Sequence, residues 1–430
     1  MKLRIHNGRV IDPASGRDEH ADVWLANGHI TAIGQTAPFE ADLTVDATGC
    51  IVAPGLVDLQ ARLREPGYEH EGMLDSELHA AVAGGVTTLV CPPDTDPVLD
   101  EPGLVDMLRY RAAQLRRARV YPLGALTRNL AGEVLTEMAE LSESGCVGFS
   151  QAETALANTQ ILQRALQYAA TFGLSVWLRP QELHLGQGVA ASGPLATRMG
   201  LSGVPVAAET IALHTIFALM RSTRARVHLC RLSSAEGVAL VRAAKAEGLP
   251  VTADVSIHSL HLTDHDMGFF DSRARLVPVL RQARDRDALR EALADGTLDA
   301  LVSDHCPVDD DAKALPFAQA EPGATGLELL LSLALKWAED CQLPLAKALA
   351  VVTHQPGQLL GAAAPEGLGQ LREGGVADLV VFDPQVTWAV EPKALLSQGK
   401  HTPFDFRISG TALPGRVKAT VVDGVLAYQA

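Results

Sequence analysis

The stretch GLVDLQARLREPG, residues 55–67, leaves an apolar run, passes through alternating residues and ends in a polar turn at Pro66 and Gly67. This order is typical of a buried strand that runs into a loop. Gln60 and Arg62 lie two residues apart, so their side chains are expected to point the same way from the end of that strand. The stretch predicts the first strand of a longer repeating pattern.

Short apolar runs rich in β-branched residues alternate with longer helical patterns, which is typical of parallel βα units. Eight runs are predicted to be strands, at 51–59, 86–91, 120–126, 145–150, 174–178, 225–230, 249–256 and 298–304. Between them, 133–144 and 234–248 show the clearest helical spacing, and each runs into a glycine. We therefore predict an α/β fold, a (β/α)8 TIM-like barrel over 53–369, with its chemistry at the C-terminal ends of the strands.

The two ends of the chain follow another pattern, in which short strands are separated by Gly and Asn. Residues 1–52 and 370–430 are predicted to form one small β-domain, assembled from both termini. The chain contains no internal repeat and no low-complexity segment.

The composition excludes several classes of protein. The 430 residues include 36 basic and 51 acidic side chains, a net charge of -15, without a basic tract, which argues against nucleic acid or anionic membrane as partners. Six scattered cysteines with no CxxC pair indicate reduced thiols. The N-terminus lacks the apolar core of a signal peptide, and no apolar run reaches the ~20 residues that span a bilayer. We expect a cytoplasmic protein.

Several longer motifs together resemble the dihydroorotases of the amidohydrolase superfamily over nearly the whole chain. They are APGLVDL followed by LREPG, PDTDP at 93–97, LTEMAELSESGCVGFS at 135–150, VSDHCP at 302–307, GVADLVVFDP at 375–384 and HTPFDFRISG at 401–410. The resemblance implies a barrel with a split β-domain. It also implies zinc, bound by an HxH pair after the first barrel strand, a carboxylate near the fourth, histidines at the fifth and sixth, and an aspartate at the eighth that serves as base.

At five of these six positions the chain carries a residue unsuited to zinc. The ligand positions implied by the resemblance fall on Gln60, Arg62, Gln151, Arg179 and Arg231, and only the aspartate is kept, as Asp304. A guanidinium group offers no lone pair at any accessible pH, and an amide oxygen is a weak ligand for zinc. The sequence therefore predicts that zinc and the catalytic residues are lost, with no metal and no cofactor.

Two further features bear on this prediction. Some relatives bridge their metals with a carboxylated lysine, but the chain has no lysine between Lys2 and Lys245. Arg64, which the resemblance assigns to the substrate carboxylate, is kept, whereas Asp94 replaces an asparagine and would repel an anionic substrate. We therefore expect no substrate-binding residues beyond these remnants.

Buried cations are tolerated when they are paired. We accordingly expect Asp304, Asp94 and Glu182 to hold the three arginines and so to close the former site with a plug of ion pairs. In an alternative, the arginines and Arg64 together bind an anion. A relocated metal among the remaining histidines is a further alternative, with His228, His258 and His305 as candidate ligands.

The chain closely resembles the non-catalytic dihydroorotase-like chains that form a complex with bacterial aspartate carbamoyltransferase, down to the loss of the HxH pair. It implies a pseudoenzyme in de novo pyrimidine biosynthesis, a structural subunit that associates as a dimer within a hetero-oligomer with the catalytic chain of that transferase. Two other hypotheses stay open. One is an active zinc-dependent dihydroorotase or other cyclic-amide hydrolase with relocated ligands. The other is a sensor that binds an anionic pyrimidine intermediate or nucleotide in the arginine-lined mouth.

Overall fold

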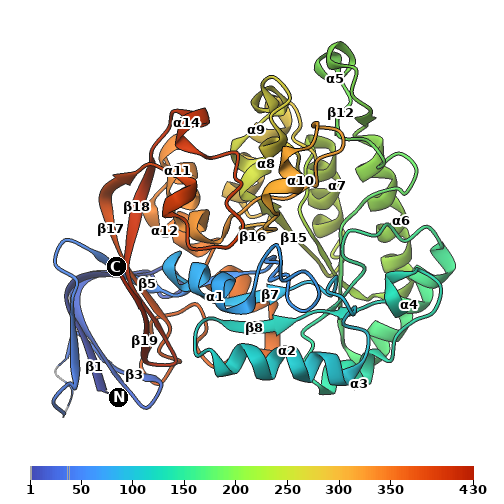
Figure 1. Cartoon of the computed structure of the whole chain (residues 1–430). Helices are drawn as coiled ribbons and strands as arrows, with labels where there is room; N and C mark the ends of the chain where they lie inside the picture. Colours follow the sequence, from blue (N-terminus) through green and yellow to red (C-terminus); the bar gives the residue numbers. More distant parts are fainter. Residues whose placement is uncertain (1, 36, 38) are drawn as a thin grey trace.

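The computed structural model describes residues 2–430 except 36 and 38. It contains a barrel of parallel strands surrounded by helices, with a β-sheet domain at one side (Figure 1). The barrel strands are β6 (Leu56–Asp58), β7 (Val86–Cys91), β8 (Arg119–Pro122) with its continuation β9 (Gly124–Ala125), β10 (Phe149–Ser150), β11 (Ser175–Leu178), β14 (Arg226–Leu229), β15 (Val251–Ser256) and β16 (Ala300–Val302). All eight predicted strands are present, and the predicted fold class is confirmed.

The barrel closes between its last strand and its first. The backbone N–H of Ser303 donates to Asp58 at 3.0 Å, and that of Arg62 donates to the carbonyl of His305 at 2.8 Å. A parallel bridge between Ala61 and His305 continues this seam. Side chains such as that of Trp177 fill the interior, which is a packed core rather than a pore.

Helices cover the outside of the barrel and its rim (Figure 1). The longer ones are α1 (Leu74–Ala83), α2 (Pro102–Gln114), α4 (Thr159–Phe172), α6 (Ala207–Thr223), α7 (Ala235–Ala246), α9 (Ala283–Asp295) and α11 (Leu330–Asp340). The shorter ones are α3 (Met138–Glu143), α5 (Pro194–Met199), α8 (Ile257–His261), α10 (Asp310–Ala314), α12 (Leu345–Ala350), α13 (His354–Leu359) and α14 (Phe406–Ser409). Within the part of the chain that is described, no helix combines the length and the apolar character needed to cross a bilayer.

The two helical segments singled out in the sequence behave differently. Helix α7 fits its prediction, and Ser234 caps it by accepting a hydrogen bond from Gly237 at 3.0 Å. The prediction for 133–144 is wrong in its first half, because only α3 is helical there. Thr136 donates its hydroxyl to the carbonyl of Ala125 at 2.6 Å, which holds the segment before α3 against the barrel in a non-helical path.

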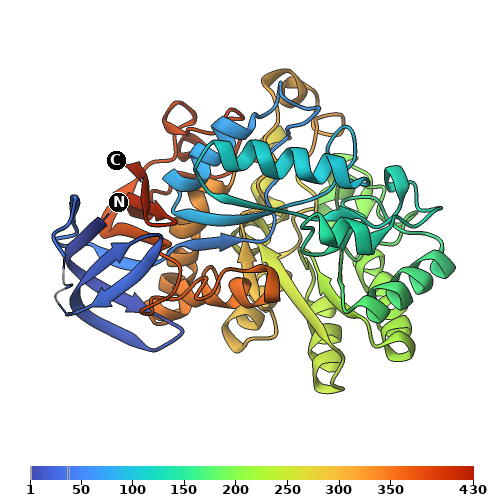
Figure 2. The same ribbon diagram turned by 90° about the horizontal axis from the view of Figure 1, so that it is seen from below.

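Strands from both ends of the chain form one sheet in the order β19-β18-β17-β5-β1-β2-β3, with β4 paired to β1. Their bounds are β1 (Lys2–Asp12), β2 (Arg17–Ala26), β3 (His29–Ile33), β4 (Leu43–Asp46), β5 (Ile51–Pro54), β17 (Leu379–Trp388), β18 (Leu413–Val422) and β19 (Val425–Gln429). Both termini lie in this sheet, at one side of the barrel (Figure 1 and Figure 2). A separate pair, β12 (Ala190–Ala191) and β13 (Gly203–Val204), lies in the loops over the barrel.

The predicted strand 51–59 divides at Gly55 into β5 of the sheet and β6 of the barrel. A Cβ atom at Gly55 would lie 2.3 Å from side-chain atoms of Thr87, so the close approach of β6 to β7 requires glycine here. The residues between β17 and β18 leave the sheet and pack on the barrel, where the Ser397 hydroxyl donates to Glu77 at 2.6 Å. The C-terminal part of the chain thus contributes to the barrel rim as well as to the sheet.

Candidate functional site

The residues singled out at the strand ends meet at the mouth of the barrel. Gln60 and Arg62 follow β6, Gln151 follows β10, Arg179 follows β11, Arg231 follows β14 and Asp304 follows β16. Because parallel strands bring their C-terminal ends to one rim, residues far apart in the sequence become neighbours. Their side chains are buried, with 6% of Arg62, 8% of Arg179 and 2% of Arg231 exposed.

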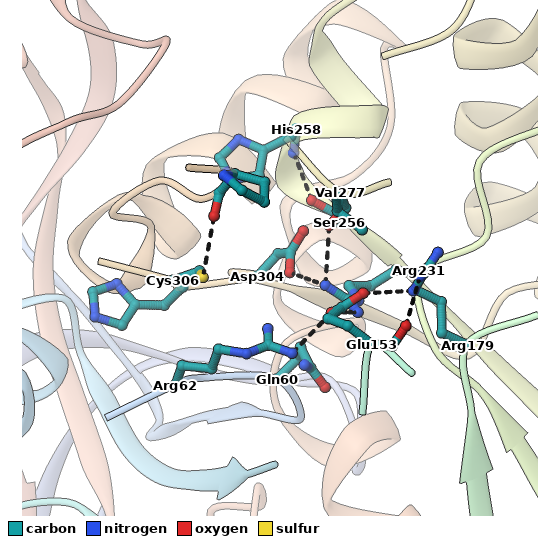
Figure 3. Close-up of polar contacts among 12 residues, drawn as sticks. Gln60, Arg62, Glu153, Arg179, Arg231, Ser256, His258, Val277, Asp304 and Cys306 are labelled. Carbon is teal, nitrogen blue, oxygen red and sulfur yellow. Dashed lines mark hydrogen bonds and ion pairs between the residues drawn. The ribbon is translucent and has the colours of Figure 1, made fainter. Parts of the chain in front are cut away.

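Three arginines converge on the carboxylate of Glu153 (Figure 3). The distance from its oxygens is 2.8 Å to the Nη2 of Arg62 and 2.5 Å to the Nε of Arg179, and the Nη2 of Arg231 also donates to it. Glu153 further accepts a hydrogen bond from Arg179 at its main-chain carbonyl, at 3.0 Å. This carboxylate is the centre of the cluster, and the sequence analysis did not single it out.

Two other carboxylates complete the cluster. Asp94, in the loop after β7, pairs with the Nε of Arg62 at 2.9 Å. Asp304 pairs with the Nη1 of Arg231 at 2.7 Å, and the same nitrogen donates to the carbonyl of Val277 at 3.1 Å. The cluster therefore contains three guanidinium groups and three carboxylates. We call these six residues the arginine–carboxylate cluster.

The expected pairing with Glu182 is wrong. Its carboxylate accepts hydrogen bonds from the backbone N–H groups of His184 and Leu185, at 2.9 and 2.7 Å, and so stabilises its own turn. Glu153 takes the place that we assigned to Glu182. The signal in the sequence was the carboxylate two residues after Gln151 in GFSQAE, on the loop of the fourth barrel strand.

The two glutamines at former ligand positions are buried but lie outside the ion pairs. Gln151 accepts a hydrogen bond from the Thr127 hydroxyl at 3.0 Å and donates its amide to the carbonyl of Leu130 at 2.7 Å. Its side chain therefore fixes the loop after β9. Gln60 is 3% exposed, and its main-chain carbonyl accepts from the hydroxyl of Ser303 at 3.4 Å.

The charges of the cluster set the protonation of its members. Burial alone would raise the pKa of Glu153, but Arg231, Arg179 and Arg62 outweigh it and hold the pKa well below its ordinary value. Burial raises the pKa of Asp304, although Arg231 opposes the effect. Burial likewise lowers the pKa of Arg179 against the opposing effect of Glu153. Guanidinium groups stay charged at neutral pH, so Glu153 is an anion held by three cations.

Backbone conformation helps to aim these side chains. Arg231 and Asp304 have φ angles of 58° and 50°, and Arg64 has a φ of 64°, all in the left-handed region. Non-glycine residues adopt this region at a cost, and the surrounding contacts must compensate for it. At Arg231 the backbone N–H donates to the carboxylate of Asp254 at 2.6 Å, which holds the residue in place.

Arg64 is occupied by the protein itself. Its Nε lies 2.7 Å from Glu71 and donates to the carbonyl of Pro307 at 2.9 Å, while its Nη2 donates to the Cys306 thiol at 3.3 Å. Glu321 lies 3.5 Å from the same guanidinium. Arg64 therefore lacks the free fork that recognition of a substrate carboxylate requires.

The histidines that could hold a relocated metal are scattered. His305 bonds Glu77 at 2.8 Å and accepts from the backbone of Gly326 at 3.1 Å. His258 stacks on Phe404, with ring centroids 5.7 Å apart, and burial lowers its pKa to about 3. Neither lies in a group of metal-type ligands within the described residues.

One group has the residue types of a metal site. His228, Cys230 and Asp254 bring one ligand atom each within 4.8 Å of one another, and all three are buried. The imidazole is already bonded on both sides, to Thr252 at 2.8 Å and to Asp254 at 2.9 Å. His228 and Asp254 are thus satisfied by hydrogen bonds in the barrel interior.

Zinc, which the fold family implies, does not fit the residues at the barrel mouth. Arg62, Arg179 and Arg231 bring three positive charges without a lone pair to the centre, and Asp304 is committed to one of them. Gln151 is likewise bonded away from the cluster. A bound divalent cation needs oxygen, nitrogen or sulfur donors at fixed geometry, and the three carboxylates of the cluster are all paired with arginines.

Comparison with known proteins agrees with the fold. The dihydro-orotase-like family model matches residues 49–237, and the amidohydrolase family model matches 206–427. The L-hydantoinase (dihydropyrimidinase) of Arthrobacter aurescens superposes with a TM-score of 0.88 at 24% identity, covering 99% of this chain and 96% of that one. At this identity the likeness concerns the fold alone.

Curated relatives match the chain over its whole length. A dihydroorotase-like protein of Pseudomonas aeruginosa is 45% identical over 431 residues and 100% of both chains. A dihydroorotase of Syntrophotalea carbinolica is 38% identical, covering 100% of this chain and 99% of the relative. On these full-length similarities and the two family models, the chain belongs to the dihydroorotase-like branch of the amidohydrolase family.

Proposed function

We propose that the chain is a non-catalytic dihydroorotase-like subunit that supports the assembly and activity of aspartate carbamoyltransferase in the cytoplasm. The observation that carries the proposal is the arginine–carboxylate cluster, in which Glu153 binds Arg62, Arg179 and Arg231 where the family resemblance implies zinc. Fold alone does not fix function, so the proposal rests on the chemistry of this site.

The cluster leaves no group able to activate water. Metal-dependent amide hydrolysis uses a bound cation to lower the pKa of water to about 7 and to polarise the scissile carbonyl. Asp304 is the base that the resemblance implies, and it accepts a charge-assisted hydrogen bond from Arg231 at 2.7 Å. Its carboxylate is therefore not free to take a proton from water. In this proposal the three arginines close the barrel mouth with ion pairs, and Arg231 neutralises Asp304, the one metal ligand of the resemblance that the chain keeps.

The rest of the barrel supports a role that depends on shape. Its eight strands, outer helices and two-ended sheet are complete in the described residues. The partner in this proposal, the catalytic chain of aspartate carbamoyltransferase, comes from the resemblance to non-catalytic chains of the family. We expect the subunit to form a dimer within that hetero-oligomer.

A zinc-dependent dihydroorotase is the second candidate function. It is favoured by full-length relatives named dihydroorotase at 38% identity. That activity would need ligands outside the arginine–carboxylate cluster, with His228, Cys230 and Asp254 as the group to examine.

Co-expression separates the two candidates. The chain, tagged, is expressed with the aspartate carbamoyltransferase of the same organism, and the eluate is assayed for transferase activity, dihydroorotase activity and zinc. We expect co-elution, transferase activity that is lost when this chain is omitted, and no stoichiometric zinc. Elution of this chain alone with zinc and with dihydroorotase activity would contradict the proposal.

A further inference from the structure

A cavity of about 410 Å³ lies directly above the arginine–carboxylate cluster. Its floor includes Arg62, Glu153 and Arg231, whereas part of its wall is apolar. The apolar wall comes from the loops over the barrel and consists of Val189, Val204, Leu276, Val277, Pro278 and Val279. A volume of this size, with apolar walls and a few polar groups, is typical of small-molecule sites.

Positive charge exceeds negative charge around this cavity, although the whole chain is acidic. The charged side chains that line it are six arginines (Arg62, Arg64, Arg179, Arg231, Arg275 and Arg281) and five carboxylates (Asp94, Glu153, Glu209, Asp304 and Glu321). Four of the arginines are in ion pairs with these acids or with Glu71. Arg275 and Arg281 make no ion pair with any described residue.

The two unpaired arginines differ in what they contact. Arg281 donates its Nε to the Ser233 hydroxyl at 2.8 Å, and that hydroxyl in turn donates to Glu209 at 2.6 Å, so its charge is compensated through one side chain. Arg275 has only a long contact, 3.4 Å from its Nη1 to the carbonyl of Leu276. The Nε of Arg275 is buried and has no hydrogen-bond partner among the described residues.

A second cation lies beside Arg275. The buried ammonium of Lys313 donates to the main-chain carbonyls of Ser272, Arg275 and Glu321, at 3.1, 3.2 and 2.7 Å, and pairs with no carboxylate in the described chain. Burial lowers the pKa of Arg275, and no carboxylate counteracts it. Arg275 is half-buried, and its inaccessible Nε lacks a hydrogen-bond acceptor, so an anion in the cavity would stabilise it.

We propose that this cavity binds a small organic carboxylate, with its carboxylate on Arg275 and its apolar body against Leu276, Val279 and Val204. A guanidinium fork matches a planar carboxylate with two parallel hydrogen bonds. A multiply charged anion fits less well, because Glu153, Asp94 and Asp304 face the same space. Arg275 rather than Arg64 is assigned this role, because the guanidinium of Arg64 already contacts Glu71, Pro307 and Cys306.

This inference deepens the proposed function and rests on it in one respect, because it requires that no metal occupies the barrel mouth. A subunit with a metal-free barrel mouth that keeps this cavity can bind a carboxylated metabolite without hydrolysing it. The ligand would be recognised by its charge and its apolar flank and would leave unchanged.

Calorimetric titration of the purified full-length chain with benzoate tests the proposal, with neutral benzamide as the probe of the same shape. We expect saturable binding of benzoate below about 10 mM and at least 10-fold weaker binding of benzamide. In Arg275→Gln the affinity for benzoate should fall about 10-fold or more, and in Arg275→Lys, which keeps the charge without the fork, by less. The matched control is Arg290→Gln. Arg290 lies outside the cavity and pairs with Asp340 at a distance of 3.3 Å, so this variant should bind benzoate like the wild type.

The outcomes are separable. Absence of benzoate binding, or equal binding by wild type and Arg275→Gln, would overturn the carboxylate site. Inorganic phosphate that binds as tightly as benzoate would also overturn it, since the site would then recognise charge alone. Zinc content is measured on the same samples, and binding that disappears with a chelator would contradict the proposed function instead.

Discussion

Replacement of Glu153 with glutamine removes the carboxylate that Arg62, Arg179 and Arg231 share. The amide keeps the size of the side chain but carries no charge, so the three guanidinium groups lose their common counterion. Arg62 keeps Asp94 and Arg231 keeps Asp304. Arg179 is left with the Gln181 side chain and the main-chain carbonyl of residue 153.

The magnitude follows from the burial of the partners. Removing one member of a buried ion pair costs about 3–5 kcal/mol, because the other charge stays buried. Two arginines retain a carboxylate, and the side chain of Glu153 is 34% exposed, so water screens part of the loss. We therefore expect the free energy of unfolding to fall by about 3 kcal/mol, the lower end of that range.

Urea unfolding at pH 7 measures this change. With a denaturant dependence of about 3 kcal/mol per molar, the midpoint should fall by about 1 M. Glu182→Gln is the matched control, since the glutamine oxygen can still accept from the N–H groups of His184 and Leu185, and we expect a loss below about 1 kcal/mol. Equal midpoints for the Glu153 and Glu182 variants would refute the central role of Glu153.

Three further changes follow from charge and packing. The pKa of Glu153 in the folded chain lies below the ordinary 4.5, so ionised Glu153 stabilises the fold above pH 4.5 and this contribution is lost progressively as the pH falls below 4.5. The urea midpoints at pH 4 and pH 7 should therefore differ less in Glu153→Gln than in the wild type. Burial raises the pKa of Asp58 to about 7, so ionisation of Asp58 lowers the stability of the fold as the pH rises from about 4 to 7. Asp58→Asn should therefore raise the urea midpoint more at pH 8 than at pH 5. An equal rise at the two pH values would contradict the prediction. Gly55→Ala should lower the free energy of unfolding by about 1–3 kcal/mol, measured by thermal unfolding, because the added methyl group clashes with Thr87. Gly103→Ala is the control, since its methyl group would meet open space, and it should not lower the free energy of unfolding.

The sequence predicts the barrel well because its signals are local and repeated. Alternating apolar runs and helical spacing identify every barrel strand, and parallel strands bring their C-terminal ends together whatever the loops do. That is why Arg62, Arg231 and Asp304 could be expected to meet. The segment 133–144 misled the same reasoning, because a tertiary hydrogen bond from Thr136 overrides its helical pattern.

Partners within the site depend on loop conformation, which periodicity does not encode. Ala152 has a φ of 50°, so the chain reverses between Gln151, which points to Thr127, and Glu153, which points to the arginines. A turn at 182–185 takes the carboxylate of Glu182 to its own backbone. Both acids are equally plausible partners in the sequence, and only the backbone angles of two short turns distinguish them.

The arginine–carboxylate cluster balances its own charges, so the barrel mouth can persist without a metal. Three guanidinium groups face three carboxylates, so the cluster is neutral only as a whole. Guanidinium cannot be deprotonated in proteins, which means that none of the three arginines can lose its charge when a neighbour is replaced. Replacing Arg231 alone with histidine would leave Asp304 without its cation and Glu153 with one fewer, at a cost in stability and without creating a complete zinc site. A zinc site at the barrel mouth would therefore require several of these positions to change together, whereas the fold needs only that the charges keep balancing.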